Sequence, residues 1–178
     1  MAPIQLVYAS APADTMLREQ LSAHLHSLVL KGLLTEWHEQ LIPAGADVAQ
    51  ERRHAWHTAD ILLILLSADY FLSDAYNEHE IQQALDRHRR EQLHIVLILI
   101  RPCDWQSTIV AHLQCLPRGV IPVTMWENQD AALVSIAQEI RHFITSQHFE
   151  RTPLSSVQRT KSTAPLQPVR VQQGPVLG

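Results

Sequence analysis

Two short aliphatic runs constrain the fold of this chain more than any other feature. They read ILLILL at residues 61–66 and IVLILI at residues 95–100, and neither contains a charged residue. A helix needs about 20 apolar residues to span a bilayer, so both runs are much too short for that role. Continuous apolar strands are typical of a parallel sheet that is covered by helices on both faces. We therefore expect both runs to be central strands of such a sheet.

Strand-like and helix-like segments alternate along the chain. The expected strands are residues 4–8, 33–39, 61–66, 93–101 and 120–124. The expected helices are residues 15–30, 47–57, 74–90 and 130–146, and residues 104–116 form a short helix or an irregular segment. This order predicts an α/β fold of parallel strands joined by right-handed crossovers, with helices on both faces. Ligands of such sheets bind beyond the carboxyl ends of the strands, so the loops after residues 8, 39, 66, 100 and 124 are candidate site loops.

The end of the chain has a different composition. From about residue 152 it is rich in Pro, Ser, Thr and Gln and shows no periodicity. Such a segment cannot bury enough apolar surface to offset the entropy lost on ordering. We expect one domain at residues 1–148, followed at residues 149–178 by a disordered tail or a linker to another domain or protein.

Charge and cysteine content exclude several classes of protein. The formal net charge is −4, so no basic field suggests binding to nucleic acid or to an anionic membrane. Cys103 and Cys115 form no metal or redox motif and are expected to be free thiols in a reducing cytoplasm. The N-terminus lacks the features of a signal peptide. His54 and His57 could share a metal only with further ligands that the sequence does not supply, so we expect no metal site.

Several collinear motifs carry a resemblance to a known family. They are WHEQLIPAGAD followed by ADILLILLS, then SADYFLSDAYNEHE, VLILIRPCDWQ and LPRGVIPVTMW. Over residues 4–148 the chain resembles bacterial TIR (Toll/interleukin-1 receptor) domains. The resemblance implies a flavodoxin-like, doubly wound sheet of five parallel strands with helices on both faces. It also implies that the loop at residues 41–48 mediates homotypic self-association and borders an active site.

Many relatives cleave NAD+ at the nicotinamide–ribose bond, and the resemblance places their essential glutamate at Glu80. A carboxylate there could stabilise an oxocarbenium-like ribosyl cation, with NAD+ as the substrate and no cofactor. Ser73, Tyr76 and Glu80 are spaced by three and four residues and would share one helix face. Tyr76 could stack on nicotinamide, and Ser73 could hold the ribose. The other expected substrate-binding residues are Ser10, Ala11, Pro12, Trp37, Ile42 and Pro43.

The resemblance leaves a choice between functions. One is an NAD+ glycohydrolase switched on by self-association, in signalling or anti-phage defence. Another is a non-catalytic adaptor that recruits other TIR domains, and a third is a nucleoside-processing relative. The sequence departs from the family pattern at Gln40, at Val48 and at Tyr76, where a cysteine is common.

Two further motifs are open to both a structural and a functional interpretation. The pair Trp37–His38 could be packing at a strand end or part of the site. The segment 101–105 could close the core edge, or form a wall of the cleft or an assembly surface.

Overall fold

The structure is a computed structural model in which residues 2–146 are described. Its sheet has five parallel strands in the order β2-β1-β3-β4-β5, which confirms the predicted fold class. The strands are β1 (Ile4–Ala9), β2 (Leu34–Trp37), β3 (Ile61–Leu66), β4 (His94–Leu99) and β5 (Cys115–Leu116). The predicted domain boundary after residue 148 and the predicted tail lie outside the described residues.

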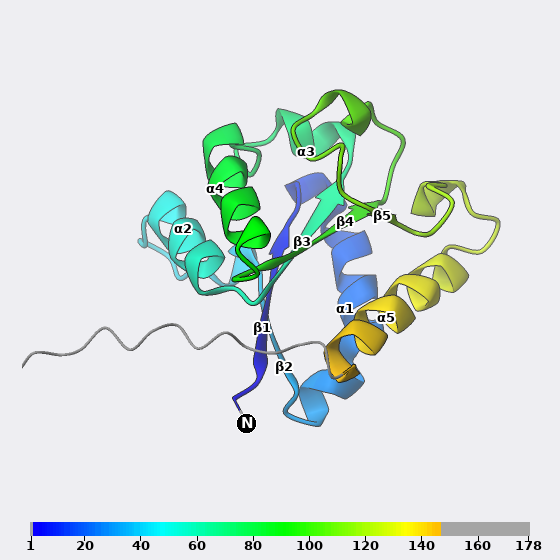
Figure 1. Cartoon of the computed structure of the whole chain (residues 1–178), viewed down its shortest axis with the longest axis horizontal. Helices are drawn as coiled ribbons and strands as arrows, with labels where there is room; N and C mark the ends of the chain where they lie inside the picture. The colour runs from blue at the N-terminus through cyan, green and yellow to red at the C-terminus, as the bar shows by residue number, and fades with distance from the viewer. Residues whose placement is uncertain (1, 147–178) are drawn as a thin grey trace, which may run out of the picture.

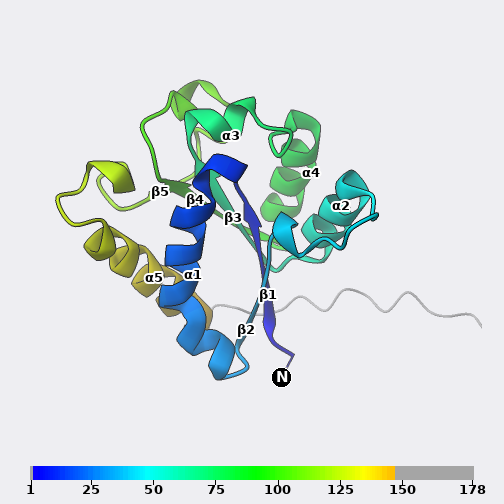
Figure 2. The same ribbon diagram turned by 180° about the vertical axis from the view of Figure 1, so that it is seen from behind.

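Helices cover both faces of the sheet (Figures 1 and 2). On one face lie α1 (Thr15–Leu30) and α5 (Gln129–Thr145). On the other lie α2 (Val48–Thr58), α3 (Ala68–Leu72) and α4 (Glu78–Arg89). Short 3-10 turns η1 (Pro12–Asp14), η2 (Glu39–Leu41), η3 (Trp105–Ser107) and η4 (Val123–Met125) lie in the connections. In the described part of the chain, no helix is long and apolar enough to cross a bilayer.

The sheet separates two hydrophobic cores. Along β3, Ile61, Leu63 and Leu65 face α1 and α5, whereas Leu62, Ile64 and Leu66 face α2 and α4. Successive side chains of a strand point to opposite faces, so a wholly apolar strand fills both cores at once. The whole run is buried, as the sequence predicted.

The expected last strand at 120–124 is wrong. The fifth strand is instead the two-residue β5, and residues 123–125 form η4. Pro122 has no N–H to donate to a ladder, and Val120 has a φ of 58°, which no strand adopts. Val123 is nevertheless fully buried, and the amide of Thr124 donates to the carbonyl of Ile100 at 3.0 Å.

The expected single helix at 74–90 is also wrong at its start. A separate short helix, α3, is capped by Ser67, whose hydroxyl accepts from the amide of Tyr70. The next helix, α4, begins only at Glu78, because Asn77 is extended and its side chain accepts from the amides of His79 and Glu80. Asn is a preferred N-cap because its side-chain oxygen satisfies free amides of the first turn.

Candidate active site between α2 and α4

A buried carboxylate joins three strand ends at the carboxyl edge of the sheet. Asp14 is fully buried after β1. It accepts hydrogen bonds from Ser67 Oγ after β3 (2.5 Å) and from Arg101 Nε after β4 (2.7 Å). Asp14 occupies the N-cap position of α1, but its side chain does not cap the helix. The loops after these strands, predicted as site loops, are therefore held together.

Three of the predicted substrate-binding residues, Ser10, Ala11 and Pro12, lie in the loop after β1. Ser10 is half-buried, Ala11 is buried and Pro12 is exposed. The carbonyl of Ala11 accepts from the amide of Asp14 at 3.0 Å, which folds the loop into η1. No described contact brings these three residues to Glu80, so their role as substrate-binding residues stays a prediction.

The segment after β2 is tied to both neighbouring helices. Gln40, one of the departures from the family pattern, accepts from Arg18 at 2.8 Å and donates to Thr15 at 2.9 Å, which links this segment to α1. Trp37 is half-buried and packs against the α2–α4 core, which supports the packing interpretation of this residue. The pKa of His38 is lowered, first by burial and then by the nearby Arg18 guanidinium.

Glu80 lies in the first turn of α4 and faces a buried arginine of α2. Its Oε2 is 3.4 Å from Nε of Arg52, and the two side chains are only 10% and 9% exposed. Arg52 also donates from Nη1 to Oε1 of Glu39 at 2.9 Å, whose side chain is 34% exposed. One guanidinium therefore faces two carboxylates.

Unpartnered polar atoms concentrate around this ion pair. Within residues 2–146, the buried atoms Oε2 of Glu80, Nε of Arg52, Nε1 of Trp56 and the hydroxyl of Tyr70 have no hydrogen-bond partner. Burial, followed by the Tyr76 hydroxyl, raises the pKa of the fully buried Tyr70. Glu39 and Glu80 raise this pKa further, whereas Arg52 lowers it. Native proteins leave few buried polar atoms unsatisfied, so each of these atoms calls for a partner such as a water or a polar ligand.

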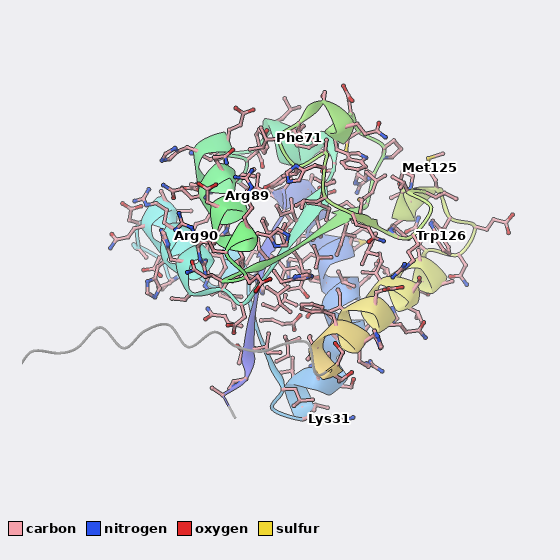
Figure 3. The ribbon with its side chains drawn as sticks, viewed as in Figure 1. Lys31, Phe71, Arg89, Arg90, Met125 and Trp126 are labelled. Atoms are coloured by element: carbon pink, nitrogen blue, oxygen red, sulfur yellow. The ribbon has the colours of Figure 1, made fainter. Side chains whose placement is uncertain are left out.

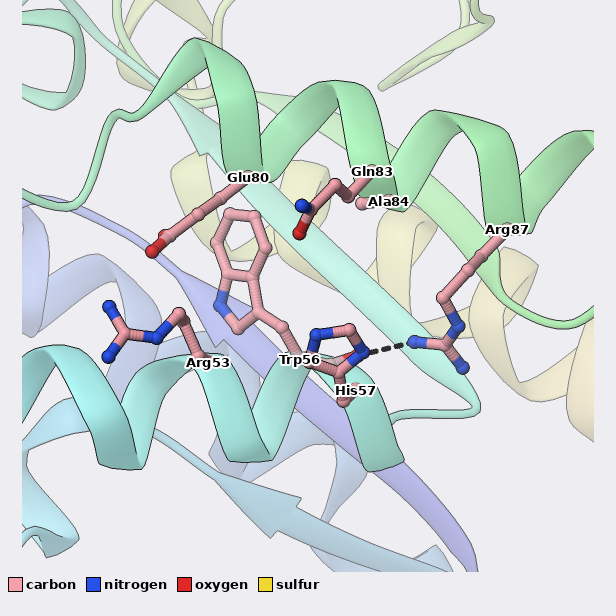
Figure 4. A pocket seen from close by; sticks show the side chains of 7 residues that line it. All are labelled: Arg53, Trp56, His57, Glu80, Gln83, Ala84 and Arg87. Atoms are coloured by element: carbon pink, nitrogen blue, oxygen red, sulfur yellow. Dashed lines mark hydrogen bonds between the residues drawn. The ribbon is translucent and has the colours of Figure 1, made fainter.

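A small hollow of about 20 Å³ opens between α2 and α4 beside Glu80. Figure 4 shows Glu80 and the Trp56 indole pointing into it from opposite helices. Its other lining residues are Arg53, His57, Gln83, Ala84 and Arg87. Arg87 fixes the helices around it by donating to the carbonyls of Trp56, Ala59 and Gln92 (the first bond is dashed in Figure 4).

The predicted helix face that joins Ser73, Tyr76 and Glu80 is wrong, because only Glu80 lies on α4. Ser73 follows α3, and its hydroxyl donates to the carbonyl of Tyr70 at 2.8 Å. The Tyr76 ring packs edge-on against Phe71, with ring centroids 5.0 Å apart, and its hydroxyl donates to Glu78 at 3.2 Å. Figure 3 shows Phe71 at the α3 end of the molecule.

Ile42 and Pro43 lie in the loop before α2, half-buried and exposed respectively. Neither lines the hollow beside Glu80. The segment after β4 serves mainly to close the core edge, because Trp105 is buried in the α2–α4 core and Arg101 binds Asp14.

Arg52 and Trp56 were missed at the sequence level. The signal was the spacing of residues 52, 55, 56 and 59, which places both with Ala55 and Ala59 on one helix face. All four are buried. Within the described chain, no group of three or more His, Cys, Asp or Glu side chains could hold a metal ion.

Comparison with known proteins identifies the family. The family model of the TIR domain matches residues 4–138. This chain belongs to the TIR domain family. The TIR domain of the Toll-related receptor TRR-2 from Hydra magnipapillata has the same fold, with a TM-score of 0.54 and 18% identity over 79% of this chain and 98% of that one.

A longer relative is similar to most of this chain. The uncharacterized protein y4lF of Sinorhizobium fredii (strain NBRC 101917 / NGR234) is 34% identical over 134 residues, which cover 75% of this chain. They cover 42% of the relative, so the chain spans less than half of the relative's length.

Proposed function

We propose that this TIR domain is an NAD+ glycohydrolase that cleaves the nicotinamide–ribose bond beside Glu80. The observation that supports this most is the carboxylate itself. It lies in the wall of a hollow, one of its oxygens is buried, and that oxygen has no hydrogen bond within the described residues. A carboxylate held in this way can stabilise a positive charge that develops next to it.

The reaction requires little of the protein beyond that charge. The bond between ribose C1′ and the pyridinium nitrogen breaks, and its electron pair leaves with neutral nicotinamide. Water then attacks the ribosyl cation and loses a proton, which gives ADP-ribose; attack by an adenine nitrogen would give a cyclic product. The Glu80 carboxylate supplies the negative charge that favours the ribosyl cation, and Glu39 offsets part of the charge of Arg52 beside it.

Trp56 takes the role of aromatic wall that the sequence assigned to Tyr76. The indole lines the same hollow as Glu80, whereas Tyr76 packs on Phe71. The hollow has a volume of only about 20 Å³, which is room for about one water molecule, so nicotinamide and its ribose would require the lining side chains to move apart. The diphosphate and the adenosine of NAD+ would extend beyond the hollow, past Arg53 in its wall.

A non-catalytic adaptor is the second candidate. Leu41 and Val48 flank the loop before α2 and are 55% and 50% exposed. Apolar side chains exposed on a loop favour contact with another protein, including a second TIR domain. This surface fits an adaptor, and it fits equally an enzyme that is activated by self-association.

The test that separates these functions is nicotinamide release from NAD+ by concentrated protein, with Glu80→Gln beside the wild type. Glu78→Gln is the matched control, because Glu78 lies in the same helical turn and is exposed. An NAD+ glycohydrolase loses release in Glu80→Gln and keeps it in Glu78→Gln. An adaptor releases no nicotinamide in any form, and a nucleoside-processing relative consumes nucleosides instead of NAD+.

A further inference from the structure

Arg52 is shared unequally between two carboxylates. Its Nη1 donates a hydrogen bond of 2.9 Å to Glu39, whereas its Nε only approaches Glu80 to 3.4 Å, without hydrogen-bond geometry. The stronger of the two contacts therefore goes to Glu39, the residue that is farther from the hollow. As a result, Arg52 and Glu80 are in ion-pair contact but share no hydrogen bond.

Glu39 belongs to a segment that ends in a loop. It is the first residue of η2, immediately after β2, and the chain then runs through residues 42–47 into α2. Its neighbour Gln40 is bound to Arg18 and Thr15 at the start of α1. A displacement of this segment would therefore move the carboxylate that holds Arg52.

The two arginines that line the hollow are not placed between two carboxylates as Arg52 is. Arg87 is bound to three backbone carbonyls, and Arg53 is exposed. Arg52 is 9% exposed at its side chain, so it has few alternatives to Glu39 and Glu80 as partners. A buried guanidinium that loses one carboxylate is expected to bind the other more closely, because an unpaired buried charge is costly.

We propose that Glu39 and Arg52 form a positioning pair that keeps Glu80 available and couples it to the segment after β2. This inference rests on the proposed function only in taking Glu80 as the reacting carboxylate. While Glu39 holds Nη1, Arg52 makes no hydrogen bond to Glu80, and the charge of Glu80 stays available to the ribosyl cation. When Glu39 is withdrawn, Arg52 turns to Glu80, and a bidentate pair occupies both carboxylate oxygens.

The loss of Glu39 would also change the charge beside Glu80, in the direction that disfavours a cation. With Glu39 in place, the charge of Arg52 is balanced first by Glu39, so less of the Glu80 charge is neutralised. Without Glu39, Arg52 and Glu80 neutralise each other. The loss should therefore lower kcat by about tenfold while KM changes by less than about twofold, because the reacting charge is affected more than the contacts to the rest of the substrate.

The activity test compares Glu39→Ala with the double variant Glu39→Ala/Arg52→Met, and uses Glu51→Gln, in the first turn of α2, as the control. We expect the double variant to be several-fold more active than Glu39→Ala alone, because removing the cation frees Glu80 again. If Glu39 has only a structural role, the double variant should be no more active than Glu39→Ala. Glu39→Gln, which keeps the shape of the side chain, should show a smaller loss than Glu39→Ala and serves if Glu39→Ala unfolds.

A second readout does not depend on catalysis. The ¹H–¹⁵N NMR signal of the Arg52 Nε–H group should move downfield in Glu39→Ala as this group forms a hydrogen bond to Glu80, and Glu80→Gln should reduce the shift. An unchanged signal would overturn the positioning pair, even if the wild type releases nicotinamide. A shifted signal in a protein that releases no nicotinamide would support the pair and refute the proposed function.

Discussion

Nε of Arg52 lies 3.4 Å from Oε2 of Glu80, and both atoms are buried between α2 and α4. The two helices follow different strands of the sheet, so the fold itself brings the charges together. Arg52 also binds Glu39 at the end of β2. Contacts of three separate segments therefore determine the environment of one carboxylate, and the same carboxylate lines the hollow.

The buried Asp14 should contribute strongly to stability. Asp14→Ala removes hydrogen bonds to Ser67 and Arg101, and we expect the free energy of unfolding to fall by about 2–3 kcal/mol, since Arg101 is partly exposed. Urea denaturation measures this change. Glu127→Ala, at an exposed loop position, is the control and should change stability by less than about 0.5 kcal/mol. Equal effects of the two substitutions would contradict this role of Asp14.

Arg87 should hold α4 to the end of α2. Arg87→Met removes three hydrogen bonds to backbone carbonyls and should lower the free energy of unfolding by roughly 1–3 kcal/mol. Arg90→Met, at an exposed position next to the same helix end, should have little effect. Thermal and urea unfolding of both variants test this, and the prediction fails if Arg90→Met destabilises the protein as much.

Stability should fall as the medium becomes acidic, partly because of His94. Burial, followed by the neighbouring His88, lowers the pKa of His94 to about 4, and its ring stacks on Phe143 at 3.9 Å. The unfolded chain binds the proton below pH ~6.5 but the folded chain does not, so unfolding is favoured as the pH falls from ~6.5 toward ~4. Because the ring is partly exposed, the loss should be roughly 2 kcal/mol.

Denaturation at a series of pH values checks this slope. His94→Phe keeps an aromatic ring for the stack and removes the titrating group, so stability should depend less on pH than in the wild type. His26→Gln removes an exposed histidine of α1 and is the control, for which the wild-type slope should be retained. A full slope in His94→Phe would assign the effect to other groups.

If self-association activates the enzyme, specific activity should rise steeply with protein concentration. Leu41→Ser removes an apolar side chain that is 55% exposed on the proposed contact surface, and it should shift the rise to higher concentration. Leu30→Ser removes a side chain that is 75% exposed at the end of α1, and it should leave the rise unchanged. A rate strictly proportional to protein concentration, through the range in which the protein assembles, would contradict activation by self-association.

The sequence predicted the centre of the fold better than its edge. β3 and β4 have apolar side chains toward both cores, and such runs can be recognised without any long-range information. The edge strand β5 has only two residues, and its position depends on pairing with β4. No local pattern distinguishes so short a strand from the apolar segment at 120–124, which Val123 anchors in the core.

The candidate site was predicted only in part. Glu80 came from a family resemblance, and the structure shows it buried beside a hollow. Arg52 was not predicted, because a charged residue on a polar helix is usually solvated and its burial depends on the acids that meet it. Tyr76 was assigned to the helix of Glu80 because the N-cap at Asn77 was not recognised.

Nicotinamide release from NAD+ by concentrated wild-type, Glu80→Gln and Glu78→Gln protein tests the central claim most directly. We expect the wild type and Glu78→Gln to release nicotinamide at similar rates, and Glu80→Gln to be slower by about 10²–10³-fold with its folding unchanged. Release that persists in Glu80→Gln would show that this carboxylate does not support the chemistry. No release from assembled wild-type protein would contradict the enzymatic function altogether.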